Sequence, residues 1–260
     1  MKTVFKIVGI LILILTAQIR SGLSQDFIFS EKWEEYKDDH FIMYYDKSIP
    51  KTYIKKFAKE CEKDYETVLD RLGFSRMDFW LFKDRAKVYL FKDRDEYLEK
   101  TGFPEFSAGA ANYEDGYIAK KTIVTYFQNK GFFENLLPHE LTHIMLEDFI
   151  GANTDIPLWF NEGLACSNEQ DREKYIQEVK KIMKEDHDLS KTISPGMEAH
   201  KFYAISASYV IYLLREYGRE KFVLLCKKLK NRKPFNNAFE EVYGFKNLDE
   251  LRIEFLQYVR

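Results

Sequence analysis

The 260-residue sequence is poor in proline and glycine, with 6 and 12 residues respectively. This scarcity excludes a collagen-like chain and disfavours a long flexible linker. The sequence also lacks an excess of either charge, because 40 Lys and Arg residues stand against 42 Asp and Glu residues. Phosphate backbones attract strongly basic proteins, so we expect no nucleic-acid partner.

Apolar and aromatic side chains are plentiful, at 45% and 16% of the residues. This composition excludes a disordered chain and can supply a sizeable core. Cysteine is scarce, and Cys61, Cys166 and Cys226 are too widely spaced for a zinc knuckle or a disulfide-dense scaffold. One disulfide, or free buried thiols throughout, are both compatible with this count.

The first 24 residues are predicted to be a signal peptide. Two lysines within Met1–Lys6 precede the apolar run Ile7–Leu15, which is shorter than the roughly 20 residues of a membrane span. Small residues follow, and we place the cleavage after Ser24. The protein is therefore expected to be secreted or to lie in the cell envelope. The alternative is an uncleaved signal that anchors the chain in the membrane; otherwise no stable membrane span is expected.

Residues 25–260 contain no internal repeat or low-complexity tract, which favours one domain. Strands are predicted over Phe41–Tyr45, Ala86–Phe91, Ala108–Tyr113 and Tyr117–Phe127, the last two as a hairpin turning at Glu114–Gly116. Helices are predicted over Lys51–Leu72, Asp93–Lys100, Phe132–Phe149, Leu158–Lys184, Phe202–Tyr217, Arg219–Leu229, Phe235–Val242 and Leu248–Val259. A small mixed sheet in the first half and helices in the second indicate an α+β fold.

The chemically informative motif is His139-Glu140-Leu141-Thr142-His143, within the predicted helix Phe132–Phe149. One helical turn separates the two histidines, so both imidazoles lie on one face and can hold one Zn²⁺ ion. A catalytic zinc site needs a third protein ligand and a position for water. Glu140 lies beside that position and can act as the general base.

Glu162 is the candidate third ligand. Eighteen residues separate it from His143, enough for the first helix to end and a second to return antiparallel. A carboxylate on an apolar helix face is costly unless it is paired or bound to a metal. The pattern therefore predicts one zinc ion per chain, held by His139, His143 and Glu162.

His139-Glu140-x-x-His143 followed by Asn161-Glu162-x-x-Ala165 resembles the gluzincin metallopeptidases, which include thermolysin and the thermolysin-like aminopeptidases. The segment Trp159-Phe160-Asn161-Glu162-Gly163-Leu164-Ala165 is most similar to the small secreted peptidase MA-like proteins. The resemblance implies a zincin-like fold with a zinc cleft between sheet and helices. It also implies the same three zinc ligands, and Glu140 as general base.

Further roles come from this resemblance alone. Gluzincins carry a Tyr or His that stabilises the oxyanion, and Tyr203 is the candidate, with His200 or Tyr209 as alternatives. By the same resemblance, the hairpin strand Tyr117–Phe127 is expected to be an edge strand that pairs with the substrate main chain; a purely structural edge is the alternative. Where thermolysin has an Asp that orients a zinc histidine, this sequence has Cys166, so that carboxylate is missing or supplied elsewhere.

We therefore expect a zinc-dependent metallopeptidase acting on a peptide or protein substrate. The alternative is an inactive zinc-binding pseudopeptidase that serves as a peptide-binding or envelope assembly module. A third reading is an inert structural domain in which the His-Glu motif is accidental.

Overall fold

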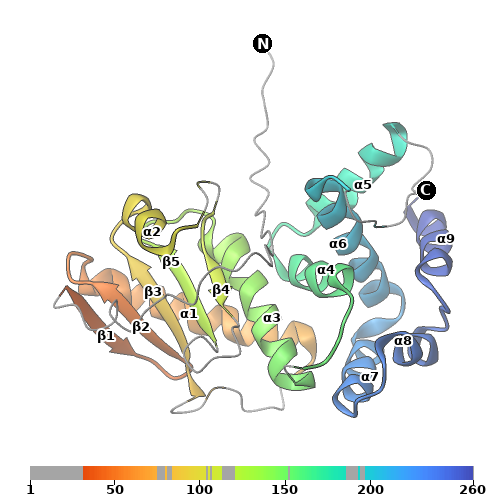
Figure 1. Ribbon diagram of the computed structural model, residues 1–260, viewed down its shortest axis with the longest axis horizontal. Coiled ribbons are helices and arrows are strands. Elements are labelled where there is room, and N and C mark those ends of the chain that lie inside the picture. The colour runs from red at the N-terminus through yellow and green to blue at the C-terminus, as the bar shows by residue number, and fades with distance from the viewer. Residues whose placement is uncertain are drawn as a thin grey trace.

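The computed structural model describes residues 32–74, 80, 84–103, 105, 107–112, 121–151, 153–185, 193 and 197–259. In this part of the chain, a five-stranded sheet lies on one side of the molecule and most of the helices on the other (Figure 1). The predicted α+β order is confirmed. The predicted signal segment 1–24 lies outside the described residues, and none of the helices within them is long and apolar enough to cross a membrane.

The sheet has the strand order β1-β2-β3-β5-β4, with parallel pairs in its centre and antiparallel pairs at both edges. Its strands are β1 (Trp33–Lys37), β2 (Phe41–Asp46), β3 (Ala86–Phe91), β4 (Ala110–Asn112) and β5 (Thr122–Tyr126). Sequence reasoning missed β1 because its residues Trp-Glu-Glu-Tyr-Lys do not alternate between apolar and polar. Pairing with β2 decides its conformation.

The predicted hairpin forms in part, with β4 antiparallel to β5 and Ala111 opposite Ile123. Its turn at Glu114–Gly116 and residues 117–120 lie outside the described residues. The prediction that the second strand is the edge strand is wrong, because β5 lies between β3 and β4. Residues 122–125 of β5 are all buried, as is typical of an interior strand, and β4 is the edge strand of the sheet within the described residues.

The helices within the described residues are α1 (Lys51–Leu72), α2 (Arg94–Thr101), α3 (Leu137–Ile150), α4 (Leu158–Asn168), α5 (Glu173–Glu185), α6 (Ala199–Glu216), α7 (Gly218–Lys230), α8 (Phe235–Tyr243) and α9 (Leu248–Val259). Alternation along β3 separates two cores: Val88 and Leu90 join the main core with α1 and α3, while Tyr89 and Phe91 pack with Tyr97 of α2. Helix α3 lies between the sheet and helices α4 to α9, while α1 and α2 lie with the sheet (Figure 1).

The predicted helix Leu158–Lys184 is wrong as a single element, because it is two helices, α4 and α5. The side chains of Ser167 and Asn168 both donate hydrogen bonds to the Leu164 carbonyl, at 2.7 and 3.1 Å, and so compete with the helical pattern. Glu169 then adopts an extended conformation that ends α4. The three cysteines are free and buried, so the open question of a disulfide is answered in favour of thiols.

Candidate metal centre

A π-helical turn over Phe132–Leu136 leads directly into α3. Pro138 has no N–H to donate to the Glu134 carbonyl four residues earlier. That carbonyl instead accepts a hydrogen bond from the Gln170 backbone N–H at 2.9 Å. The segment that follows α4 is thereby held against the start of α3.

His139 and His143 extend from α3 toward Glu162 of α4. The two Nε2 atoms lie 3.2 Å apart. Glu162 Oε2 is 3.5 Å from His139 Nε2, and Glu162 Oε1 is 3.8 Å from His143 Nε2. The structure thus brings all three predicted ligands together, with one ligand atom of each within 4.8 Å of the others.

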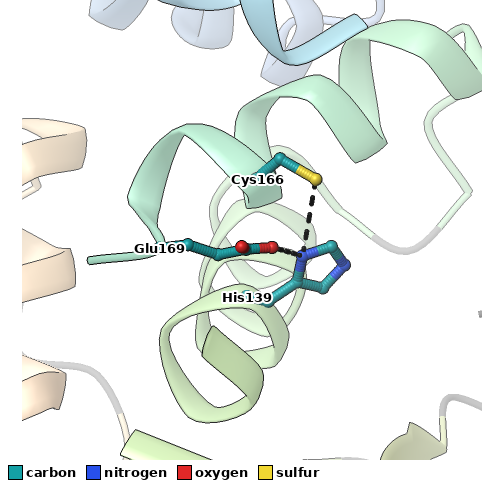
Figure 2. Close-up of side chains that lie close together, drawn as sticks. All are labelled: His139, Cys166 and Glu169. Carbon is teal, nitrogen blue, oxygen red and sulfur yellow. Dashed lines mark hydrogen bonds and ion pairs between the residues drawn. The ribbon is translucent and has the colours of Figure 1, made fainter. Parts of the chain in front are cut away.

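Both histidines have an acceptor at the other ring nitrogen. His139 Nδ1 lies 3.2 Å from Glu169 Oε1, a contact that Figure 2 shows from α3 to the end of α4. His143 Nδ1 lies 3.0 Å from Asn161 Oδ1. These partners favour the tautomer with its proton on Nδ1, which leaves each Nε2 lone pair for a metal.

The donor set fits a zinc ion. Two Nε2 atoms and a carboxylate converge, and the buried Glu162 Oε2 has no hydrogen-bond partner within the described residues. Three acceptors facing one another are compatible only with a shared proton or a cation. Two imidazoles and one carboxylate are the ligand types of catalytic zinc sites.

Without a metal, the pKa values of the two histidines are shifted in opposite directions. Burial lowers the pKa of His139, but its contacts with Cys166, Glu162 and Glu169 outweigh this effect and raise the pKa well above its usual value. Burial lowers the pKa of His143, and this effect outweighs the negative charge of Glu162, which raises the pKa. The two rings are thus chemically distinct, and His139 is the one surrounded by negative charge.

Glu169 is the carboxylate that sequence reasoning missed. Its Oε2 accepts hydrogen bonds from Lys174 Nζ at 2.7 Å and Tyr175 OH at 2.9 Å, while its Oε1 faces His139. Glu169 follows Glu162 by seven residues, or two helical turns, and this spacing is the signal that could have revealed it. Cys166 stands where thermolysin has its Asp, and a carboxylate that faces His139 Nδ1 is instead present three residues later, at Glu169.

Cys166 lies in the same cluster, with its Sγ 3.8 Å from His139 Nδ1 (Figure 2). His139, Cys166 and Glu169 also form a group whose ligand atoms lie within 4.8 Å of one another. However, burial raises the pKa of the Cys166 thiol to about 11, and a metal ligand must be the thiolate. The set of His139, His143 and Glu162 is the better metal site.

Glu140 is 2% exposed and follows His139 on α3. Burial raises the pKa of Glu140 to about 7; the charge of His139 and a backbone hydrogen bond from Ala111 lower it, and Glu162 raises it. A carboxylate with such a pKa can both accept and return a proton near neutral pH. The Ala111 contact links Glu140 directly to the edge strand β4.

Tyr203 on α6 is close enough to the centre for its hydroxyl to feel the charges of Glu162, His139 and Glu140. Burial, followed by Glu162, raises the pKa of Tyr203 far above its usual value, so the hydroxyl keeps its proton. The two alternatives lie elsewhere: His200 is about half exposed beside Glu198, and Tyr209 is buried against Trp159 and Phe255.

A buried pair of histidines and a glutamate, with a second carboxylate beside them on an α+β scaffold, defines a metallopeptidase-like domain. Residues 81–259 match the family model of the Peptidase MA superfamily. The chain belongs to this superfamily, as its resemblance to the gluzincins predicts. No curated protein matches the chain.

Proposed function

We propose that this chain is a zinc-dependent metallopeptidase that hydrolyses peptide bonds. The observation that carries the proposal is the convergence of His139, His143 and Glu162 beside the buried carboxylate of Glu140. The family match over residues 81–259 supports the same class of protein.

His139, His143 and Glu162 would hold the metal. A zinc ion bound there supplies Lewis acidity, which polarises a carbonyl and makes water more acidic. Glu140 takes the proton from the attacking water and returns it to the leaving amine. Glu169 and Asn161 keep the two imidazole rings in their orientations through the Nδ1 contacts.

Tyr203 is the proposed donor to the oxyanion that develops on the scissile carbonyl. Its neutral hydroxyl and its electrostatic coupling to Glu140 and Glu162 support this role. The edge strand β4 is the proposed pairing partner for an extended substrate main chain, because its Ala111 backbone contacts Glu140.

The substrate is a peptide or protein outside the cytosol, if residues 1–24 export the chain as their sequence predicts. The test is cleavage of a mixed peptide library by residues 25–260, read by mass spectrometry with bound zinc measured on the same samples. Glu140→Gln is the inactivating variant, and Glu147→Gln on the same helix is the control for loss of one charge.

We expect zinc in all three proteins, turnover in the wild type and in Glu147→Gln, and a loss of about 10²- to 10⁴-fold in Glu140→Gln. Zinc-loaded wild type that binds peptides without cleaving them would favour the pseudopeptidase instead. Absence of zinc from every sample would refute the metallopeptidase assignment.

A further inference from the structure

The position of the edge strand β4 relative to Glu140 bears on the candidate site. Among the residues that the structure describes, β4 pairs with β5 from Ala110↔Val124 to Asn112↔Thr122. The backbone of Ala111 contacts the Glu140 carboxylate, so a shift of β4 would change the surroundings of this group.

Side-chain hydrogen bonds hold the segment that enters β4. Asn129 Nδ2 donates to the carbonyl of Ala108, two residues before β4, at 2.7 Å. The buried Thr125 hydroxyl donates to the same carbonyl at 3.2 Å, and Asn129 Nδ2 also reaches Thr125 Oγ1 at 3.0 Å. Two side chains thus hold one backbone carbonyl of the segment that enters the strand.

The other side of the Asn129 amide holds the segment that leads to the metal helix. Its Oδ1 accepts from the Gly131 N–H at 3.2 Å, and its backbone carbonyl accepts from the Phe132 N–H at 3.3 Å. Phe132 begins the π-helical turn that continues into α3. One residue therefore joins the edge strand to the helix that carries His139 and Glu140.

Close packing sets the distance between these two elements. A Cβ on Gly109 would lie 2.2 Å from Leu136 Cδ2 and 2.7 Å from the Val124 carbonyl oxygen, so only glycine fits there. The Gly109 carbonyl accepts from Ser107 Oγ, which in turn pairs with the hydroxyl of the buried Tyr97 at 2.6 Å. The backbone at Gly109, just before β4, thus packs directly against Leu136 at the end of the π-helical turn.

We propose that Asn129 is a positioning residue for substrate binding: it fixes β4 so that an extended peptide main chain pairs with this strand beside Glu140. The ligand class is a peptide in extended conformation, recognised by its backbone N–H and C=O groups. This inference rests on the proposed function for the position of the substrate, but it concerns peptide binding and is testable without turnover.

The test uses zinc-loaded protein in a Glu140→Gln background, so that bound peptide is not cleaved. Fluorescence anisotropy gives the Kd of a labelled ten-residue substrate and of the same peptide with N-methylated backbone amides. Asn129→Asp keeps the acceptor for Gly131 but replaces the donor to Ala108 by an oxygen. Thr125→Val is the second variant, and Asn237→Asp, exposed on α8, is the matched control.

For Asn129→Asp we expect a Kd about tenfold higher for the unmodified peptide, unchanged zinc content, and little further effect of N-methylation, because backbone pairing is already impaired. Thr125→Val should weaken binding severalfold, and it decides the case if Asn129→Asp fails to fold. The control should bind as the parent does.

An unchanged Kd in both variants, or equal losses for the unmodified and the N-methylated peptide, would overturn the inference. Failure of the parent protein to bind any peptide would overturn it as well. Peptide binding that depends on Asn129, together with a wild type that never cleaves, would refute the proposed activity and leave the inference standing.

Discussion

Replacing Glu169 by Gln should weaken zinc binding even though Glu169 is not a proposed ligand. Its Oε1 lies 3.2 Å from His139 Nδ1, and its Oε2 receives Lys174 Nζ and Tyr175 OH. Gln is nearly isosteric with Glu but uncharged. If its amide oxygen stays toward His139, its NH₂ group faces the donors Lys174 Nζ and Tyr175 OH. A hydrogen bond to a charged group contributes about 1.5–3 kcal/mol, so we expect a loss of about 10- to 100-fold in zinc affinity.

The assay is competition for zinc between the purified protein and a chromophoric chelator at fixed pH. Glu173→Gln is the control, since Glu173 is an exposed residue paired with Arg215. Glu162→Gln should lose more affinity than Glu169→Gln, because it alters a proposed ligand itself. Zinc affinity in Glu169→Gln equal to that of the control would refute the role assigned to the carboxylate.

Three further changes test other parts of the structure. Tyr203→Phe should lower kcat by about 10²- to 10³-fold with little change in KM, as steady-state kinetics would show; equal activity would exclude Tyr203 as the oxyanion donor. Gly163→Ala places a Cβ 2.3 Å from the Ser206 carbonyl oxygen, so thermal unfolding should reveal a destabilisation of about 1–3 kcal/mol; an unchanged Tm would contradict the close α4–α6 packing. Burial and the charge of Glu60 raise the pKa of Asp64 to about 7, above the pKa of Asp in the unfolded chain. The folded state therefore binds the proton of the Asp64 carboxyl more tightly than the unfolded state does, and the protein loses stability as the pH rises from about 4 to 7. The free energy of unfolding of Asp64→Asn, relative to that of the wild type, should therefore rise by about 1–2 kcal/mol between pH 5 and pH 8 in denaturant titrations. This value allows for solvent screening of the partly exposed side chain. A difference between the two proteins that does not change with pH would contradict the raised pKa of Asp64.

Sequence reasoning was most successful where the signal is local. The bounds of α1 are those predicted, because an amphipathic pattern ends at Gly73, which adopts the left-handed conformation with φ of +75°. The bounds of β3 are also those predicted. The spacing of His139 and His143 places both imidazoles on one face of any helix, so their proximity followed from the motif itself.

Elements that depend on partners were harder to predict. Strand β1 forms because β2 offers it an unpaired edge, and its sequence carries no comparable signal. The order of β4 and β5 in the sheet follows from the pairing of β5 with β3, a contact between residues more than thirty positions apart, such as Val88 and Ile123. Local propensity does not encode which strand becomes the edge.

The sequence by itself indicated the class of this protein and named its candidate ligands. Helical periodicity puts His139 and His143 on one face of a helix, and the 18-residue gap allows Glu162 to return toward them on a second helix. Only the tertiary structure decided which carboxylate supports His139. Glu169 reaches the imidazole because α4 ends there and the Gln170 N–H is held by the Glu134 carbonyl that Pro138 leaves free. That contact joins two segments whose approach depends on the packing of whole helices. The seven-residue spacing from Glu162 could make Glu169 a candidate, but it could not establish the contact with His139.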